Sequence, residues 1–150
     1  MLINVKKFDY SVLDEIKPLN MRGGRKDKKK YYDIVTAFDI ETTRIKDIEQ
    51  SFMYIWQFQI LDYTVYGREW SEFITFFENL KAKLNEDKRY IVVYVHNLSY
   101  EFQFLRGIYD FKTEEVFALE SRKIAKCYMW NKFEFRCSYI HSNMSLSEFT

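Results

Sequence analysis

Two apolar runs constrain the fold of this chain more than any other feature: YYDIVTAFDI at residues 31–40 and YIVVYVHN at residues 90–97. Both are rich in aromatic and β-branched residues and almost continuously apolar, which is typical of central strands covered on both faces. Further strand-like and helix-like runs lie around them. Their mixed order predicts an α/β (α+β) layer fold in which these two runs form neighbouring central strands.

The remaining elements follow from periodicity. Strands are expected at 51–61 and 63–70, with a tight turn at Asp62, and three more at 111–119, 123–130 and 133–140. Helices are expected at 71–86, with Ser71 as a cap, and at 98–107, with Ser99 as a cap and Gly107 as a stop. Ser145 and Glu148 have the spacing of a capping box for a last short helix. The apolar side chains of the first helix are Phe73, Phe76, Phe77, Leu80 and Leu84.

The composition is that of a dense globular domain, with 19% aromatic residues, only 4 Gly and 1 Pro in 150 residues. No apolar segment reaches the roughly 20 residues of a membrane span, and the N-terminus lacks the apolar core of a secretory signal. We therefore expect a cytoplasmic protein with no membrane partner. A hairpin turning at Asn131-Lys132 would place Cys127 and Cys137 on opposite faces, which predicts no disulfide between them.

Basic charge is concentrated at the N-terminus, where residues 1–30 hold nine Lys or Arg and four Asp or Glu. We interpret 1–30 as a basic extension and 31–150 as the folded domain. The stretch RGGRKDKKK at 22–30 is either a solvated loop or one that contacts nucleic-acid phosphate. The same two alternatives, with a solvated face as the default, apply to the basic residues of the later hairpin, Arg122, Lys123, Lys126, Lys132 and Arg136.

Asp39 and Glu41 carry the strongest chemical signal, because they end an apolar strand two residues apart. Burying one ionised carboxylate without a partner is costly, so either a cation holds them or they sit at an exposed strand end. Residues i and i+2 of a strand share a face. Glu101, one turn into the helix after 90–97, approaches the same spot if the two central strands are neighbours. Three hard oxygen ligands of this kind suit Mg²⁺ or Mn²⁺.

Two segments together resemble a known family. FDIETT at 38–43 and YVHNLSYEFQFL at 94–105 resemble two exonuclease motifs of the family B DNA polymerases, most closely the protein-primed branch of phages and linear plasmids. In that branch the first motif reads D-x-E-T-T and the second H-N-L-x-[FY]-D. FEFRCSYIHSNMSLSEF at 133–149 resembles a later strand-then-helix stretch of the same branch. The resemblance runs from about residue 32 to residue 150.

The resemblance implies a ribonuclease H-like fold, a mixed central sheet flanked by helices, and a 3′–5′ exonuclease that edits the unpaired 3′ end of single-stranded DNA. It implies metal-binding and catalytic roles for Asp39, Glu41 and Glu101. It implies contacts to the DNA strand for four residues that match the family's positions, namely Thr42, Asn97, Tyr100 and Ser138. His96 is interpreted as a hydrogen-bonded residue at a strand end rather than a metal ligand.

Two departures from the family pattern leave alternatives open. Glu101 stands where the second motif has Asp, and the family's third motif, a Tyr followed by Asp further along the chain than the segment 133–149, is not found. The fold is thus expected to be C-terminally truncated, with apolar Leu146 and Phe149 needing the remainder of a polymerase or another protein to cover them. The alternatives are a catalytically impaired protein that binds DNA ends or a protein partner, as an inhibitor or accessory factor, and a fragment without a function of its own.

Overall fold

The structure is a computed structural model that describes residues 1–19, 30–45, 50–85, 89–120 and 123–138. The predicted short helix at 145–150, and the basic loop apart from Lys30, lie outside these residues. In the described part, no helix combines the length and apolarity that crossing a membrane requires.

The elements follow one another in a mixed order that matches the predicted α/β class. In chain order they are β1 (Leu2–Asn4), the 3₁₀ turns η1 (Val5–Lys7) and η2 (Tyr10–Glu15), β2 (Pro18–Leu19), β3 (Lys30–Ile45), β4 (Gln50–Ile60), β5 (Tyr63–Gly67), α1 (Trp70–Lys83), β6 (Arg89–Val95), α2 (Leu98–Leu105), η3 (Thr113–Glu115), β7 (Val116–Glu120), β8 (Lys123–Met129) and β9 (Phe133–Cys137).

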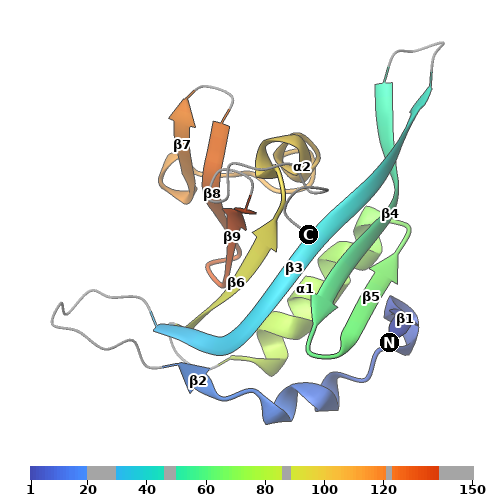
Figure 1. The fold of residues 1–150 in the computed structure, drawn as a ribbon, viewed down its shortest axis with the longest axis vertical. Coiled ribbons are helices and arrows are strands. Elements are labelled where there is room, and N and C mark those ends of the chain that lie inside the picture. Colours follow the sequence, from blue (N-terminus) through green and yellow to red (C-terminus); the bar gives the residue numbers. More distant parts are fainter. Residues whose placement is uncertain (20–29, 46–49, 86–88, 121–122, 139–150) are drawn as a thin grey trace, which may run out of the picture.

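Among the described residues, nine strands form one mixed sheet in the order β1-β5-β4-β3-β6-β9-β8-β7, and β2 pairs separately with β3. The two apolar runs of the sequence are adjacent, because β3 and β6 pair in parallel, and β6 pairs in parallel with β9. β4 runs antiparallel to β3 on its other side. The central strands, in the order β5-β4-β3-β6-β9, form a mixed sheet, as the sequence predicts, with β3 in the middle (Figure 1).

β3 is longer than the sequence indicates. Its antiparallel pairing with β4 continues past residue 40 to the pair Ile45↔Gln50, whereas its parallel pairing with β6 ends at Ala37↔Tyr94. Beyond that point β3 and β4 continue as a two-stranded extension, which we call the arm and define as Thr42–Ile45 with Gln50–Tyr54. Figure 1 shows the arm projecting past the rest of the sheet.

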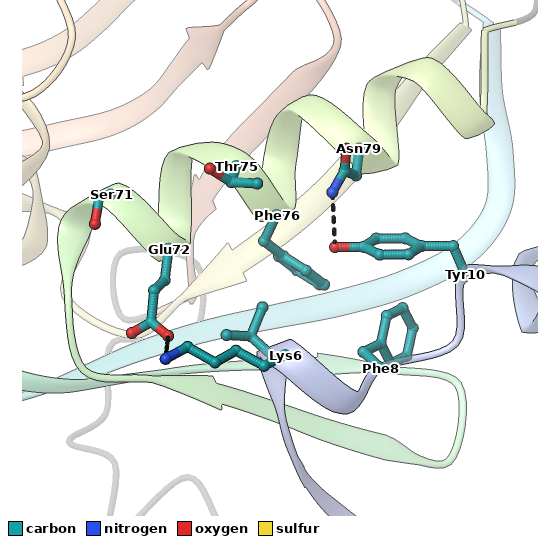
Figure 2. A pocket seen from close by; sticks show the side chains of 9 residues that line it. Lys6, Phe8, Tyr10, Ser71, Glu72, Thr75, Phe76 and Asn79 are labelled. Atoms are coloured by element: carbon teal, nitrogen blue, oxygen red, sulfur yellow. Dashed lines mark hydrogen bonds and ion pairs between the residues drawn. The ribbon is translucent and has the colours of Figure 1, made fainter.

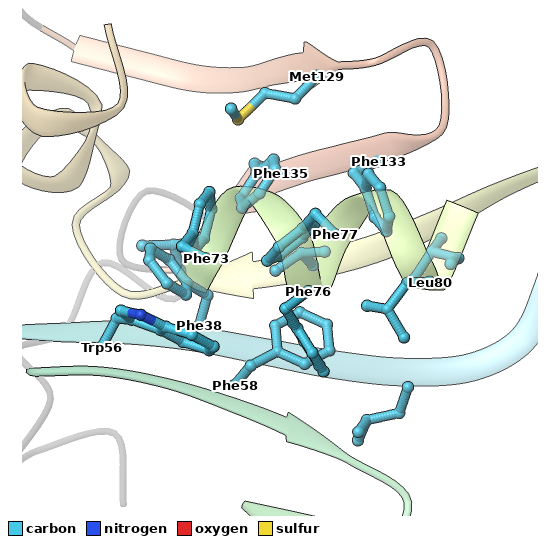
Figure 3. Close-up of a cluster of buried hydrophobic side chains, with 14 of the residues drawn as sticks. Phe38, Trp56, Phe58, Phe73, Phe76, Phe77, Leu80, Met129, Phe133 and Phe135 are labelled. Atoms are coloured by element: carbon cyan, nitrogen blue, oxygen red, sulfur yellow. The ribbon is translucent and has the colours of Figure 1, made fainter. Parts of the chain in front are cut away.

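The helix α1 packs against one face of the sheet. The sequence correctly predicts this helix from the spacing of its apolar side chains. Its side chains interlock with rings from β3, β4 and β9; Phe77, for example, lies with its ring centroid 5.1 Å from Phe58 and 4.6 Å from Phe133 (Figure 3). Trp56 also donates from its indole Nε1–H to the carbonyl of Glu69, at 3.0 Å. The helix begins at Trp70 and its N-cap is Glu69, two residues before the predicted cap Ser71; the Glu72 side chain accepts from the backbone N–H of Glu69.

The first nineteen residues belong to the same core as the sheet. β1 pairs in parallel with β5, and Val5, Phe8 and Leu13 are buried in the aromatic cluster. The Phe8 ring meets Phe76 of α1 edge-on, with centroids 5.7 Å apart. This part of the predicted extension therefore packs onto the folded body, while a domain boundary at residue 30 stays a prediction.

The β8–β9 hairpin corrects the expected cysteine geometry. Met129 pairs with Phe133, so the loop has three residues. Cys127 therefore lies opposite Phe135, whereas a two-residue loop at Asn131-Lys132 would place it opposite Arg136. Trp130 and Asn131 both adopt positive φ, which makes this longer loop possible and shifts the register by one residue. Both cysteines therefore face the same core, contrary to the prediction, and both are buried free thiols.

Phe77 lies at the centre of the core, and its truncation tests the packing. Because the ring is fully buried, we expect Phe77→Ala to lower the free energy of unfolding by about 3–5 kcal/mol. Leu119→Ala is the matched control: this side chain is 64% exposed on β7, and its loss should cost less than about 0.5 kcal/mol. Urea denaturation measures both, and equal losses for the two variants would contradict the assigned core.

Candidate functional site

Asp39 and Glu41 lie on β3 at the place where its parallel neighbour stops. β6 pairs with β3 only as far as Ala37, so the acids stand just beyond the carboxyl end of β6, while β4 still pairs with them through Gln57 and Ile55. Both carboxylates are exposed. The expectation that β3 itself ends at these acids is wrong, but a strand end does lie beside them, which is where open α/β sheets place their ligands.

A tight turn carries the chain from β6 into α2 and sets the position of Glu101. Asn97 occupies the residue before the helix with φ 62° and ψ 61°, a left-handed conformation that Asn tolerates better than most residues. Glu101 therefore falls in the first turn of α2, where a negative charge is favoured by the helix dipole. The predicted cap, Ser99, has another role, since its Oγ accepts from the backbone N–H of Ile124 at 2.9 Å.

The charges of the three acids are coupled through Asp39. Burial, with an added contribution from the negative charge of Asp39, raises the pKa of Glu101 to about 8. Partial desolvation and the negative charge of Glu41 raise the pKa of Asp39 above its ordinary value. Asp39 thus lies within electrostatic range of both other acids, one on its own strand and one on α2. That the three residues form one metal site stays a prediction.

Of the three acids, Glu101 is the one whose ionised form the fold stabilises least. Its side chain is only 4% exposed, and its Oε2 is buried without a hydrogen-bond partner. An unsatisfied buried carboxylate oxygen is costly, and either a proton or a cation relieves that cost. Carboxylate oxygens are the ligands that Mg²⁺ and Mn²⁺ prefer, so the donor set fits such an ion in chemistry and in charge. Within the described ranges, no three Asp, Glu, His or Cys side chains come close enough, as they stand, to share one ion.

The other predicted residues surround this point in pairs. The hydroxyls of Thr42 on β3 and Tyr100 on α2 are 2.6 Å apart, which ties the strand to the helix directly beside the acids. His96, the residue before Asn97, lies with its Nδ1 3.0 Å from Ser138 Oγ. His96 is therefore the hydrogen-bonded residue at a strand end that the sequence predicts. The four residues that are predicted to contact DNA lie where β3, β6 and β9 meet α2; they are Thr42, Asn97, Tyr100 and Ser138.

Sequence reasoning missed a buried polar cluster around Glu134 on β9. This carboxylate is fully buried, and it accepts from the hydroxyls of Tyr31 (2.9 Å) and Tyr128 (2.5 Å) and from Arg136 Nε–H. Burial alone would raise the pKa of Glu134, but the bonds from Tyr128, Arg136 and Tyr31 lower it below its ordinary value. The signal in the sequence was Glu134 itself, the single acid among the basic residues of that hairpin.

The default interpretation of that hairpin as a solvated basic face is wrong for two of its residues. Lys132 is buried, with its Nζ 4.8 Å from the ring centroid of Tyr32. Arg136 is half-buried, pairs with Glu134, and stacks over the Tyr31 ring at 5.3 Å. Lys123 remains exposed, and Arg122 lies outside the described residues.

A separate hollow of about 400 Å³ lies between the N-terminal segment and α1 (Figure 2). Tyr10 accepts there from the side-chain amide of Asn79 at 3.2 Å, and Lys6 lies 3.9 Å from Glu72. None of the residues predicted for the acid site lines it. Its lining consists of Val5, Lys6, Phe8, Tyr10, Ser71, Glu72, Thr75, Phe76 and Asn79.

Comparison with known proteins bears on the fold. A solved structure of Phi29 DNA polymerase complexed with primer-template DNA superposes with a TM-score of 0.50 over 77% of this chain, at 12% sequence identity. This chain is similar in fold to part of a DNA polymerase. It spans 22% of that polymerase chain, and at this identity the likeness concerns the fold alone. No family model and no curated protein sequence matches the chain.

The Thr42–Tyr100 contact predicts a measurable coupling between β3 and α2. We expect Thr42→Val and Tyr100→Phe each to destabilise the fold, with the double variant losing less than their sum, since each single change leaves the other hydroxyl without its partner. The coupling energy should be about 0.5–1.5 kcal/mol. Urea denaturation of the four proteins measures it, and strictly additive losses would show that the two hydroxyls do not interact.

The Glu134 cluster predicts a defined pH window. The pKa of Glu134 is lower in the folded chain than its ordinary value of 4.5, so its stabilisation is complete above that value and is lost as the pH falls through the folded pKa. We expect Glu134→Gln to have a lower Tm than wild type at neutral pH. The Tm difference should narrow as the pH falls below about 4.5. A difference that stays constant from neutral pH to about pH 3 would contradict the assigned pKa direction.

Proposed function

We propose that this chain is the 3′–5′ exonuclease region of a protein-primed family B DNA polymerase, which hydrolyses the 3′ end of single-stranded DNA with Mg²⁺ or Mn²⁺. The observation that carries the proposal is the position of Asp39, in electrostatic range of both Glu41 and Glu101 at the carboxyl end of β6. The similarity in fold to part of a DNA polymerase supports it, as do the two motifs in which these acids occur.

The roles of the acids follow from their surroundings. Asp39 and Glu41 are exposed, so their carboxylates can rotate to meet an ion, whereas Glu101 is fixed in the first turn of α2. When bound, a divalent cation would supply a more acidic water and would neutralise negative charge on the scissile phosphate. Glu101 would offer the same cation its buried Oε2, which has no hydrogen-bond partner.

The neighbouring residues are placed to position the strand. Thr42 and Tyr100 hold each other beside the acids, so the Tyr100 ring is oriented by its hydroxyl as well as by its contact with Phe104. An oriented aromatic side chain stacks on a base with little loss of entropy. Asn97 in the β6–α2 turn and Ser138, which lies 3.0 Å from His96 Nδ1, are the polar groups that we assign to the sugar-phosphate chain.

Glu101 takes the place of a shorter Asp in the family's motif. The additional methylene displaces the carboxylate by about a bond length, and a displacement of ~1 Å in such a site costs on the order of 100-fold in rate. We therefore expect a slow enzyme. The presence of Glu101 in place of Asp also supports a second function, in which the chain binds the 3′ end of DNA or a protein partner without cleaving DNA.

The decisive measurement is Mn²⁺-dependent shortening of a single-stranded oligonucleotide that carries a label at its 5′ end. We expect Asp39→Ala to lower the rate by at least about 100-fold, since it removes the central acid of the trio. Asp33→Ala is the matched control, because Asp33 is an exposed acid of the same strand and lies outside the trio. It should leave the rate within about twofold of wild type.

Metal binding is tested without activity. Saturating Mn²⁺ should raise the Tm of wild type and of Asp33→Ala, by an amount equivalent to about 2.7 kcal/mol at 100 times the Kd, and should not raise that of Asp39→Ala. A metal-dependent Tm without cleavage, together with salt-dependent binding of the oligonucleotide, would favour the binding function. Cleavage that survives Asp39→Ala would refute the assigned site.

A further inference from the structure

The arm formed by β3 and β4 carries a second feature beside the acids. From Glu41 to Thr42 the partner on β4 changes from Ile55 to Met53, so Tyr54 is an additional, unpaired residue opposite this step. Such a bulge bends its strand and re-aims a side chain, and bulges are frequent next to active sites. The bulged strand lies one strand spacing, about 4.8 Å, from the acid-bearing segment of β3.

Two aromatic side chains of the arm are exposed to solvent. Tyr54 is 47% exposed and Phe52 is 42% exposed, although Trp56 and Phe58 on the same strand are fully buried. In the described part of the chain, no other ring packs against either of them, in contrast to the dense ring contacts of the core. Two open rings on one strand beside a polar site are available to stack on a planar ligand.

The chemistry of the arm fits single-stranded nucleic acid. The paired strands of the arm, 42–45 and 50–54, carry one charged residue, Arg44, while the segment 46–49 between them adds Lys46, Asp47 and Glu49. Exposed rings combined with a guanidinium are the groups that bind unpaired strands, through base stacking and phosphate pairing. Phe52 and Tyr54 lie two residues apart on the bulged strand, at most about 7 Å along it, and each ring offers a face to a separate base.

The same surface is poorly suited to an apolar protein partner. Each exposed apolar residue faces a polar one across the arm, since Phe52 pairs with Thr43 and Ile45 pairs with Gln50. Protein-binding surfaces need a contiguous apolar core, and this alternation interrupts it.

We propose that Phe52 and Tyr54 form a stacking platform, with Arg44 as a phosphate partner, for the part of a single strand that lies behind the end held at Asp39 and Glu41. This proposal rests on the proposed function, which supplies single-stranded DNA as the substrate. It extends that function by assigning the internal nucleotides of the DNA strand to the arm. The platform contributes affinity for long strands and leaves hydrolysis of the terminal bond unchanged.

The test measures binding and cleavage separately. Fluorescence anisotropy in EDTA gives the affinity for an oligothymidylate of about twelve nucleotides without hydrolysis, and we expect Phe52→Ala/Tyr54→Ala to weaken it about 5- to 100-fold. Phe52→Tyr/Tyr54→Phe keeps both rings and should bind within about twofold of wild type. Phe117→Ala, which removes a 46% exposed ring from β7, is the matched surface control and should also bind normally. With Mn²⁺, cleavage of a thymidine dinucleotide should be equal in all four proteins.

Each outcome decides one of the two proposals. Loss of affinity in the alanine variant alone supports the platform, even if wild type cleaves nothing and the nuclease function fails. Equal affinity of wild type and the alanine variant overturns the platform, even if both cleave the dinucleotide and the nuclease function stands. Wild type that does not bind the oligonucleotide overturns the platform as well. A self-association of wild type that the alanine variant abolishes, with oligonucleotide affinity unchanged, would identify the arm as a protein contact instead.

Discussion

The position of β3 between an antiparallel and a parallel neighbour is the constraint on which the rest of the structure depends. Its inward residues, such as Phe38, pack against α1, and this fixes its register against β4 and β6. A slip of one residue would turn Phe38 and Ile40 to solvent and bury Asp39 and Glu41. The packing of Phe38 and Ile40 in the aromatic core therefore sets the direction of the two acids between and beside them.

Two buried carboxylates show opposite solutions to the same electrostatic problem. Glu134 is saturated by two tyrosine hydroxyls and an arginine, and its pKa is lowered despite complete burial. Glu101 is buried with an oxygen that accepts from no group, and its pKa is raised to about 8. Glu134 is stabilised within the fold, which is typical of a structural group. The free-energy cost of burying the Glu101 carboxylate is not offset within the fold, which is typical of a group at a ligand-binding site.

Sequence patterns predicted the parts of the fold that one local rule decides. The spacing of Phe73, Phe76 and Phe77 identified α1, and the two apolar runs identified β3 and β6 as neighbours. The β8–β9 register was missed because this three-residue loop has positive φ at both Trp130 and Asn131, and a Trp is rarely found in that conformation. The length of β3 was missed because its last residues are polar and are held by pairing with β4 alone.

The candidate site was predictable in its residue types and in part of its geometry. The spacing of Asp39 and Glu41 gave a shared face, but the approach of Glu101 depends on the left-handed turn at Asn97, which leaves no periodic pattern. The Glu134 cluster joins Tyr31 to residues about a hundred positions away, and only the completed sheet brings them together. Long-range polar contacts of this kind follow from topology, which single-residue preferences do not encode.

The parallel pairing of β3, β6 and β9 also governs how the molecule forms. Each of these strands must find a partner that is separated from it in sequence by an intervening strand or helix, so the entropy of closing long loops is lost before the central contacts repay it. Topologies dominated by distant pairings fold slowly. The acids on β3 come to lie near Glu101 on α2 only through the pairing of β3 with β6, so the site cannot assemble before that distant pairing has formed.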